Sequence, residues 1–224
     1  MMDKKFMYSL LTRMPLLQGI SGMELARIEE RIDFETEEMP ARPSPFIKQG
    51  QVCRELVFLV EGTLSRQTVF ADGLYVATEF LLVPLVIEAD KLYGLNCEYS
   101  STYRARSECH LMRISKKQVG DLLAKSEIFR LNYMNMLSAA IQRMETKQRP
   151  MILASPAEKI RHFILGCFSN EQGEKSLQIK MTDLAAFIGE TRLTVSRHLN
   201  ELCDDGIISL KRKEICIPDL TRLR

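Results

Sequence analysis

The sequence predicts an α+β protein in which an antiparallel, jelly-roll-like β-roll is followed by one long helix and then by a small helical domain that ends in a β-hairpin. Three observations predict this order. Short β-rich runs alternate with glycines in the first half, glycine is almost absent from residues 115–149, and two helical patterns flank Gly189 near the end. A chain of 224 residues is long enough to give two domains separate cores.

The β-roll prediction rests on the punctuation of residues 40–114. Prolines at 40, 43 and 45 and glycines at 50, 62, 73 and 94 separate runs such as LVFLV and TLSRQTVF. Short strands that recur between glycine turns are typical of an antiparallel barrel or a double-sheet roll. We expect a short helix over residues 20–31 before the roll, with Ser21 and Glu24 as its capping box.

Two strands of the roll can be placed more closely. In TLSRQTVF-ADG-LYVATEFL, Asp72 and Gly73 can adopt the positive φ angles that a tight hairpin turn requires. We expect one last strand over residues 102–114, in which Tyr103 and Ala105 alternate with arginines at 104 and 106.

Residues 115–149 are predicted to form one amphipathic helix, because Phe129, Tyr133 and Met144 belong to an apolar series spaced by three or four residues. Such a stripe is wider than the preceding domain can cover, so we expect a second copy of the helix in a two-fold dimer. Packing within a monomer is the alternative. Residues 149–155 should be a linker, and Ser155, Pro156 and Glu158 should begin the next helix.

The segment KMTDLAAFIGETRLTVSRHLNELCDDG, residues 180–206, indicates a helix-turn-helix. Ala185, Gly189 and Val195 fall where this motif needs a small residue, a turn glycine and an apolar packing residue. The following GIISL, Lys211-Arg212-Lys213 and EICIP predict a hairpin wing. The C-terminal domain is therefore predicted to be a winged helix-turn-helix that binds DNA.

The second helix of this motif should enter the major groove with its N-terminal end. Thr191 can cap it, while Val195, Leu199 and Leu202 form its buried face. The predicted DNA contacts are Thr191, Arg192, Leu193, Thr194, Ser196 and Arg197, together with the wing residues Lys211, Arg212 and Lys213. Arginine matches the two acceptors of guanine, so Arg192 and Arg197 should read bases, whereas the wing cations should neutralise phosphates. A merely solvated helix face is the alternative for both arginines.

Composition limits the other possibilities. The net charge of +2 is too small to indicate nucleic-acid binding by itself, so a DNA site must be a local patch. Six scattered cysteines without a C-x-x-C pair argue against a zinc site and a disulfide framework. The N-terminal segment lacks a secretory signal, and the longest apolar run, residues 80–87, contains Pro84 and is too short to span a bilayer. We expect a soluble, cytoplasmic protein.

The domain order and the TRLTVSR segment, with FIKQG, EGTL and the ADG hairpin in the roll, resemble the Crp/Fnr family of bacterial transcription regulators. This resemblance implies an effector-sensing β-roll at 1–114, a dimerisation helix at 115–149 and a DNA-binding domain at 150–224. It also implies a homodimer on a palindromic double-stranded operator, with half-sites about 34 Å apart, and RNA polymerase as a further partner. Many members carry glutamate where this chain has Leu193, so part of the half-site should differ.

The resemblance also places an effector pocket at Glu88, Tyr99, Ser100, Met144 and Glu145. Members that bind cyclic AMP surround its phosphate with Gly-Glu and Arg-Ser pairs, which here read Ile87-Glu88 and Tyr99-Ser100. Without the arginine a buried phosphate is poorly paired, so we expect an effector other than cyclic AMP. No metal or cofactor is expected, because the N-terminal cysteine cluster of iron-sulfur members is missing and only His110, Cys53, Cys97 and Cys109 offer haem ligands in the roll.

Three functions remain open at this point. The first is an effector-gated dimeric transcription regulator. The second is a regulator of the same build whose sensor domain has become vestigial and which acts without a ligand. The third is an enzyme with a cupin-like metal pocket, which the single histidine of the roll, His110, disfavours. We expect a regulator and not an enzyme.

Overall fold

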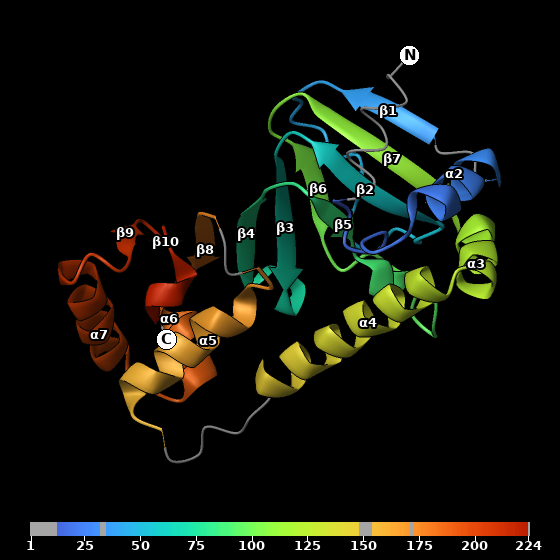
Figure 1. Ribbon diagram of the computed structural model, residues 1–224. Coiled ribbons are helices and arrows are strands. Elements are labelled where there is room, and N and C mark those ends of the chain that lie inside the picture. Colours follow the sequence, from blue (N-terminus) through green and yellow to red (C-terminus); the bar gives the residue numbers. More distant parts are fainter. Residues whose placement is uncertain (1–12, 32–34, 148–153, 171–172, 224) are drawn as a thin grey trace. The chain divides into compact units, whose positions relative to one another are not determined.

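The computed structural model describes residues 13–31, 35–147, 154–170 and 173–223, and it confirms the predicted α+β class (Figure 1). The described helices are α2 (Gly22–Arg31), α3 (Lys116–Lys125), α4 (Glu127–Lys147), α5 (Pro156–Cys167), α6 (Met181–Ile188) and α7 (Arg192–Asp204). The strands are β1 (Glu35–Met39), β2 (Glu55–Glu61), β3 (Leu64–Phe70), β4 (Tyr75–Leu81), β5 (Leu85–Ile87), β6 (Thr102–Ala105), β7 (Cys109–Ser115), β8 (Lys175–Ile179), β9 (Ser209–Lys211) and β10 (Glu214–Ile217). Three short 3-10 turns are η1 (Ala71–Gly73), η2 (Ala89–Lys91) and η3 (Leu220–Leu223).

The strands form two sheets, and both contain antiparallel pairs. One sheet has the order β1-β7-β2-β5 and the other has the order β6-β3-β4-β8-β10-β9. The chain divides into two compact units, of which the first comprises Met1–Leu64, Leu82–Ser100 and Arg104–Arg143 and the second comprises Ser65–Leu81, Ser101–Tyr103 and Met144–Arg224.

In the first unit the four-stranded sheet supplies the core. Phe58 and Leu59 on β2 and Leu111 and Ile114 on β7 are almost completely buried, and Phe129 of α4 is buried as well. Strand β2 lies between β7 and β5, and its run LVFLV is apolar throughout because consecutive residues, which point to opposite faces, are all buried. Gly62 follows β2 with a φ of +97°, and a Cβ there would lie 2.4 Å from the carbonyl oxygen of Glu108. Only glycine fits this corner.

In the second unit, β4 pairs with β8 over five residues, from Tyr75 opposite Ile179 to Glu79 opposite Lys175. Aromatic rings of β4, α5 and α6 also meet in this unit. The ring centroid of Tyr75 on β4 lies 5.3 Å from those of Phe163 on α5 and Phe187 on α6. Glu79 is 2% exposed, and one of its oxygens accepts hydrogen bonds from the backbone N–H groups of Ser169 and Asn170, each at 3.0 Å. Its other oxygen pairs with Arg66. These bonds satisfy a carboxylate that would otherwise be costly to bury.

Two sequence-predicted elements are divided in the structure. The strand expected over residues 102–114 is wrong as a single strand, because β6 and β7 belong to different sheets. The turn between β6 and β7 is held by a distant residue, Thr63. Its carbonyl accepts from the N–H of Arg106 at 2.9 Å, and its N–H donates to the Ser107 hydroxyl at 2.9 Å. The alternation predicted on the first part holds, with Tyr103 and Ala105 buried.

The long helix predicted over residues 115–149 is likewise wrong as one helix, because Ser126 separates α3 from α4. Its backbone is extended, and its buried hydroxyl donates to Glu24 at 2.6 Å and accepts from the N–H of Phe129 at 3.3 Å. One serine thus follows the end of α3 and caps the start of α4. The predicted linker at 149–155 lies outside the described residues up to position 153.

Several local predictions are confirmed. Ser21 caps α2 by accepting from the N–H of Glu24 at 3.2 Å, and Ser155 forms a full capping box with Glu158 at the start of α5. The hairpin β3–β4 turns where it was expected, with φ angles of 54° at Asp72 and 95° at Gly73. Among the described residues, no helix is both long enough and apolar enough to cross a membrane.

Candidate nucleic-acid interface

Helix α7 begins at a cap made by its own sequence. The Thr191 hydroxyl accepts from the N–H of Thr194 at 3.1 Å, and the two threonine hydroxyls lie 2.8 Å apart. Thr191 has the extended backbone of an N-cap residue. Both threonines were predicted DNA contacts. In the structure, their hydroxyls contact each other and the Thr191 hydroxyl caps the start of α7.

The faces of α7 separate as the sequence predicts. Val195, Leu199 and Leu202 are buried. On the outer side, Arg192 and Arg197 are exposed, Leu193 is 81% exposed and Ser196 is half-buried. The exposed residues follow the cap within two turns, so they occupy the end of the helix that a major groove accepts.

The turn before α7 is held in place by Gly189 and Glu190. Gly189 ends α6 with a φ of +68°, a left-handed conformation that favours glycine. The Glu190 carboxylate lies 2.6 Å from the ammonium of Lys159 on α5, and its N–H donates to the carbonyl of Ala185 at 3.0 Å. These contacts set the orientation of α7 against the rest of the domain.

The wing strands lie at one end of the six-stranded sheet, where β10 lies between β9 and β8. Lys213 stands in the turn with a φ of +62°, and Lys211, Arg212 and Lys213 are all exposed. Strand β8 (KSLQI) was not predicted, because its five residues are too few and too polar for a strand pattern to stand out.

A groove of about 370 Å³ lies between the start of α7, the start of α6 and the wing, and we call it the cationic groove. Its charged lining consists of five cations and one carboxylate: Lys180, Arg192, Lys211, Arg212, Lys213 and Glu214. Lys180 and Thr182, which also line it, were missed because nothing in their local sequence marks them. Only the packing of α6 beside the wing brings them to the same groove.

Arg197 has an acidic neighbour on its own helix, Glu201, which can compete with DNA for its guanidinium. Its Nε is 3.9 Å from a carboxylate oxygen of Glu201, one turn further along α7. Glu201 also lies 2.7 Å from Nδ1 of His198. Since Arg197 and Glu201 are mostly exposed, this pair is weak and can be exchanged for another partner.

In the first unit, the structure brings Glu88 and Ser100 together. One carboxylate oxygen of Glu88 accepts from the backbone N–H of Ser100 at 2.6 Å and from its hydroxyl at 2.9 Å. Glu88 has a φ of +35° immediately before η2. Beside it, the buried hydroxyl of Tyr133 on α4 donates to the carbonyl of Ala89 at 2.6 Å. We call Glu88, Ser100, Ala89 and Tyr133 the Glu88–Ser100 site.

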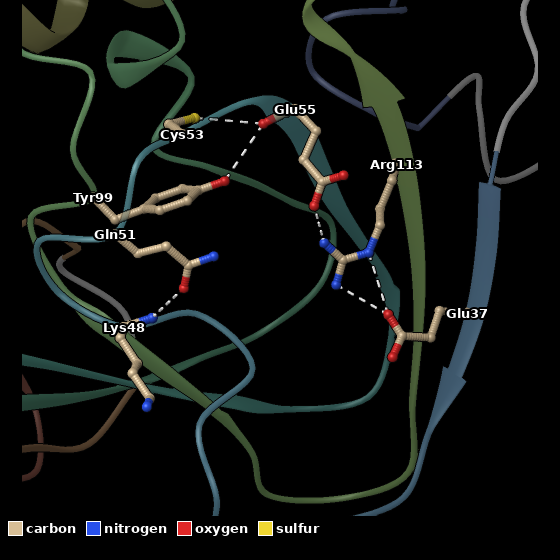
Figure 2. A network of polar contacts seen from close by, with 7 residues as sticks. All are labelled: Glu37, Lys48, Gln51, Cys53, Glu55, Tyr99 and Arg113. Carbon is tan, nitrogen blue, oxygen red and sulfur yellow. Dashed lines mark hydrogen bonds and ion pairs between the residues drawn. The ribbon is translucent and has the colours of Figure 1, made fainter.

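Tyr99 belongs to a different network, which Figure 2 shows. Its ring is buried, and its hydroxyl donates to the carbonyl oxygen of Glu55 at 3.4 Å, as does the thiol of Cys53. Burial, followed by the hydrogen bond with Cys53, raises the pKa of Tyr99. Tyr99 therefore stays protonated and donates to Glu55 rather than to the Glu88 carboxylate.

The same network contains Arg113, which lies between Glu37 and Glu55 (Figure 2). Burial alone would lower the pKa of this guanidinium, but the carboxylates of Glu55 and Glu37 outweigh burial and raise it. Arg113 joins β7 to β1 and β2 by charge-assisted bonds across the sheet. It is a structural cation of the roll.

The remaining predicted pocket residues are Met144 and Glu145, near the C-terminal end of α4. Both are exposed. Leu131, Met134, Ile141 and Met144 are each between 50% and 59% exposed on α4. Among the residues that the structure describes, no group of three or more His, Cys, Asp and Glu side chains is arranged to hold a metal ion.

Comparisons with known proteins agree with this architecture. Residues 158–224 match the family model of the Crp-like helix-turn-helix domain. A search of curated protein sequences found no significant match. The predicted resemblance to Crp/Fnr regulators is confirmed by the family model for the C-terminal domain and by solved structures for the fold.

Two solved structures illustrate the shared fold. The catabolite activator protein of Thermus thermophilus is 18% identical with a TM-score of 0.55, and the match covers 93% of this chain and 96% of that chain. The c-di-GMP responsive global regulator CLP of Xanthomonas campestris is 16% identical with a TM-score of 0.50, covering 96% and 99% respectively. At these identities the likeness concerns the fold.

Proposed function

Residues 158–224 form a Crp-like helix-turn-helix domain, and on that premise we propose that the protein is a sequence-specific DNA-binding transcription regulator that acts as a homodimer. The observation that carries this proposal is the convergence of the α7 N-terminus and the wing on the cationic groove. A chain with a net charge of only +2 concentrates five cations there. Such a local patch attracts phosphates although the whole chain is nearly neutral.

The contacts divide by chemistry. Arg192 and Arg197 are proposed to read bases, because a guanidinium can donate two parallel hydrogen bonds to guanine. Leu193 is 81% exposed and presents a side chain that can contact only apolar groups, such as the methyl of thymine. Ser196, Thr191 and Thr194 offer hydroxyls close to the same edge.

Phosphate contacts are proposed for Lys211, Arg212 and Lys213, with Lys180 and Thr182 as further candidates from the groove. These residues fix the position of the domain on the duplex and carry no sequence information. Together with the base-reading arginines they form a surface that tracks one groove edge and one strand of the backbone.

Dimerisation is proposed through α4. Its exposed apolar residues Leu131, Met134, Ile141 and Met144 are spaced by three, seven and three residues, which places them along one exposed apolar seam on one side of the helix. Two copies joined along this seam would present two recognition helices to half-sites about 34 Å apart. We retain residues 1–114, 115–149 and 150–224 as the sensing, dimerising and DNA-binding segments of this proposal, with RNA polymerase as a further partner.

For the sensing half we propose a small effector other than cyclic AMP, bound near the Glu88–Ser100 site. The Glu88 carboxylate occupies both the N–H and the hydroxyl of Ser100, which are donors that a phosphate would need, and its charge would repel that phosphate. The same repulsion argues against transfer of the c-di-GMP response named for the Xanthomonas protein. A vestigial sensor that leaves DNA binding independent of any ligand is the second candidate, favoured by this self-occupied pair. Neither version requires enzymatic activity.

The test begins with selection of bound sequences from a random DNA pool, with and without a cell metabolite extract. We expect a palindrome, and a dependence of its enrichment on the extract would favour the gated version over the ligand-independent one. On the selected operator, Arg197→Ala should weaken binding about 5- to 150-fold, with much less effect on scrambled DNA. Arg212→Ala is the matched control, and it should weaken both DNAs alike and reduce the salt slope by about 1. Equal losses on both DNAs for Arg197→Ala would contradict its base-reading role.

A further inference from the structure

Two cysteines of the roll face each other across an isolated antiparallel bridge. Val52 pairs with Glu98 in this bridge. Because the two segments are antiparallel, the residue after Val52, Cys53, lies opposite the residue before Glu98, Cys97. The N–H of Cys53 donates to the carbonyl oxygen of Cys97 at 2.6 Å, and on the other side of the bridge the N–H of Tyr99 donates to Gln51 at 2.9 Å. The hydrogen-bond pattern therefore makes Cys53 and Cys97 a directly opposed pair.

This register suits a disulfide bond. Directly opposed residues of a hydrogen-bonded antiparallel pair have Cα atoms about 5.5 Å apart and side chains on the same face. Disulfides span Cα separations of about 4.4–6.8 Å. Both cysteines carry free thiols in this structure.

Three of the other cysteines have different neighbours. Cys109 is opposed to Met39, and Cys216 is opposed to Ser176 and Ser209. Cys167 lies in α5 with its thiol 3.2 Å from the carbonyl of Phe163, four residues earlier. The opposed register thus distinguishes Cys53 and Cys97.

The two thiols differ in their surroundings. Cys97 is half-buried, and its sulfur lies 3.4 Å from the carbonyl of Gly94 and 3.9 Å from that of Leu92. Cys53 is only 3% exposed, and burial raises its pKa above the usual thiol range. A solute can therefore reach Cys97, whereas Cys53 is a buried thiol that stays protonated.

We propose that Cys53 and Cys97 form a reversible disulfide when the protein meets a hydroperoxide. Cys97 gives up its thiol proton, its sulfur attacks a peroxide oxygen, and the O–O bond breaks. The leaving alkoxide or hydroxide takes up that proton, so the products are a sulfenic acid on Cys97 and an alcohol or water. The Cys53 sulfur then attacks the Cys97 sulfur, an S–S bond replaces the S–OH bond, and the Cys53 proton leaves with the hydroxide as water. Two thiols are oxidised and one peroxide is reduced.

The disulfide would form beside the Glu88–Ser100 site. Tyr99 and Ser100 follow Cys97 by two and three residues, and Cys53 currently donates to the same Glu55 carbonyl as Tyr99. Turning the Cys53 sulfur toward Cys97 removes that bond. Oxidation therefore changes the contacts of the segment that supplies Ser100 to Glu88.

The experiment uses the reduced full-length protein without DNA, so that its outcome is independent of the proposed function. After treatment with hydrogen peroxide, the protein is denatured and its thiols are alkylated. We expect four of the six cysteines to be alkylated, a mass lower by about 2 Da before alkylation, and a cross-linked Cys53–Cys97 peptide that dithiothreitol removes. Six alkylated thiols, a cross-link between other cysteines, or addition of oxygen without a cross-link would overturn the proposal.

Variants assign the two roles. Cys53→Ser should leave Cys97 as a sulfenic acid that dimedone traps, whereas Cys97→Ser should abolish both the cross-link and the trapped product. Cys216→Ser is the matched control and should form the Cys53–Cys97 disulfide as the unmodified protein does. Trapping at Cys53 in the Cys97→Ser variant would reverse the roles and contradict the assignment based on burial.

Discussion

Helix α7 and the Glu88–Ser100 site differ in how far along the chain their contacts reach. The cap of α7 joins residues three apart, Thr191 and Thr194, and the residues it presents follow within two turns. The Glu88–Ser100 bond joins residues twelve apart, and Tyr133 reaches Ala89 across forty-four. Local contacts allowed the sequence to place the first region, whereas the second depends on how separate segments pack.

The comparison also extends to charge. The cationic groove gathers exposed cations, whereas the Glu88–Ser100 site pairs its carboxylate internally. A surface whose charges are exposed binds by attraction and tolerates small changes in shape. A site that has satisfied its own polar groups binds a ligand only by exchanging those bonds.

The largest effect is expected on the buried face of helix α7. Leu199→Ala should lower the free energy of unfolding by about 2–5 kcal/mol, because Leu199 is fully buried in the core of the second unit. Leu193→Ala makes the same chemical change on the same helix at an exposed position and should change stability by less than about 0.5 kcal/mol. Urea unfolding of both variants measures the difference, and equal losses would mean that α7 does not pack as described.

A smaller effect is expected where distant segments meet. Tyr133→Phe keeps the ring but removes the hydroxyl that donates to Ala89, leaving the Ala89 carbonyl only its 3.4 Å bond from the N–H of Leu92. We expect a loss of about 0.5–1.5 kcal/mol in the free energy of unfolding, which is the usual net contribution of one hydrogen bond, again measured in urea. If the loss were near zero, water would replace the hydroxyl, and the long-range contact would not stabilise the site.

The smallest effect is expected at the exposed ion pair between Arg197 and Glu201. Glu201→Gln removes the carboxylate 3.9 Å from Arg197, which should free the guanidinium for DNA. Because exposed pairs contribute at most about 1 kcal/mol, operator affinity should rise by no more than about fivefold. Asp204→Asn removes one negative charge from the exposed C-terminal end of the same helix and serves as the control. A similar gain in both variants would indicate a general charge effect rather than release of Arg197.

The winged helix-turn-helix was predictable because its signals are short in range. Gly189 needs a positive φ angle, Thr191 caps within three residues, and Val195, Leu199 and Leu202 repeat at helical spacing. The β3–β4 hairpin was predictable for the same reason at Asp72 and Gly73. Each of these features is decided within about ten residues of sequence.

The two elements that were wrongly predicted as continuous, the helix over residues 115–149 and the strand over residues 102–114, are divided by contacts with distant residues. Ser126 looked like one polar residue in a helical series, and only its bond to Glu24, a hundred and two residues away, explains why α3 ends there. The break between β6 and β7 likewise depends on Thr63, across more than forty residues. Periodicity predicts that such segments are helical or extended, but it carries no information on the partner that divides them.

By itself, the sequence determined the α+β class, the order of the elements and the residues that α7 exposes, because caps, turns and apolar periods act between neighbours in the chain. The tertiary structure alone decided that Lys180 and Thr182 share the cationic groove with the wing, that Tyr99 donates to Glu55 while Ser100 donates to Glu88, and that Cys53 lies opposite Cys97. These arrangements depend on strand register and helix packing. Register is set by contacts between segments that no local pattern connects.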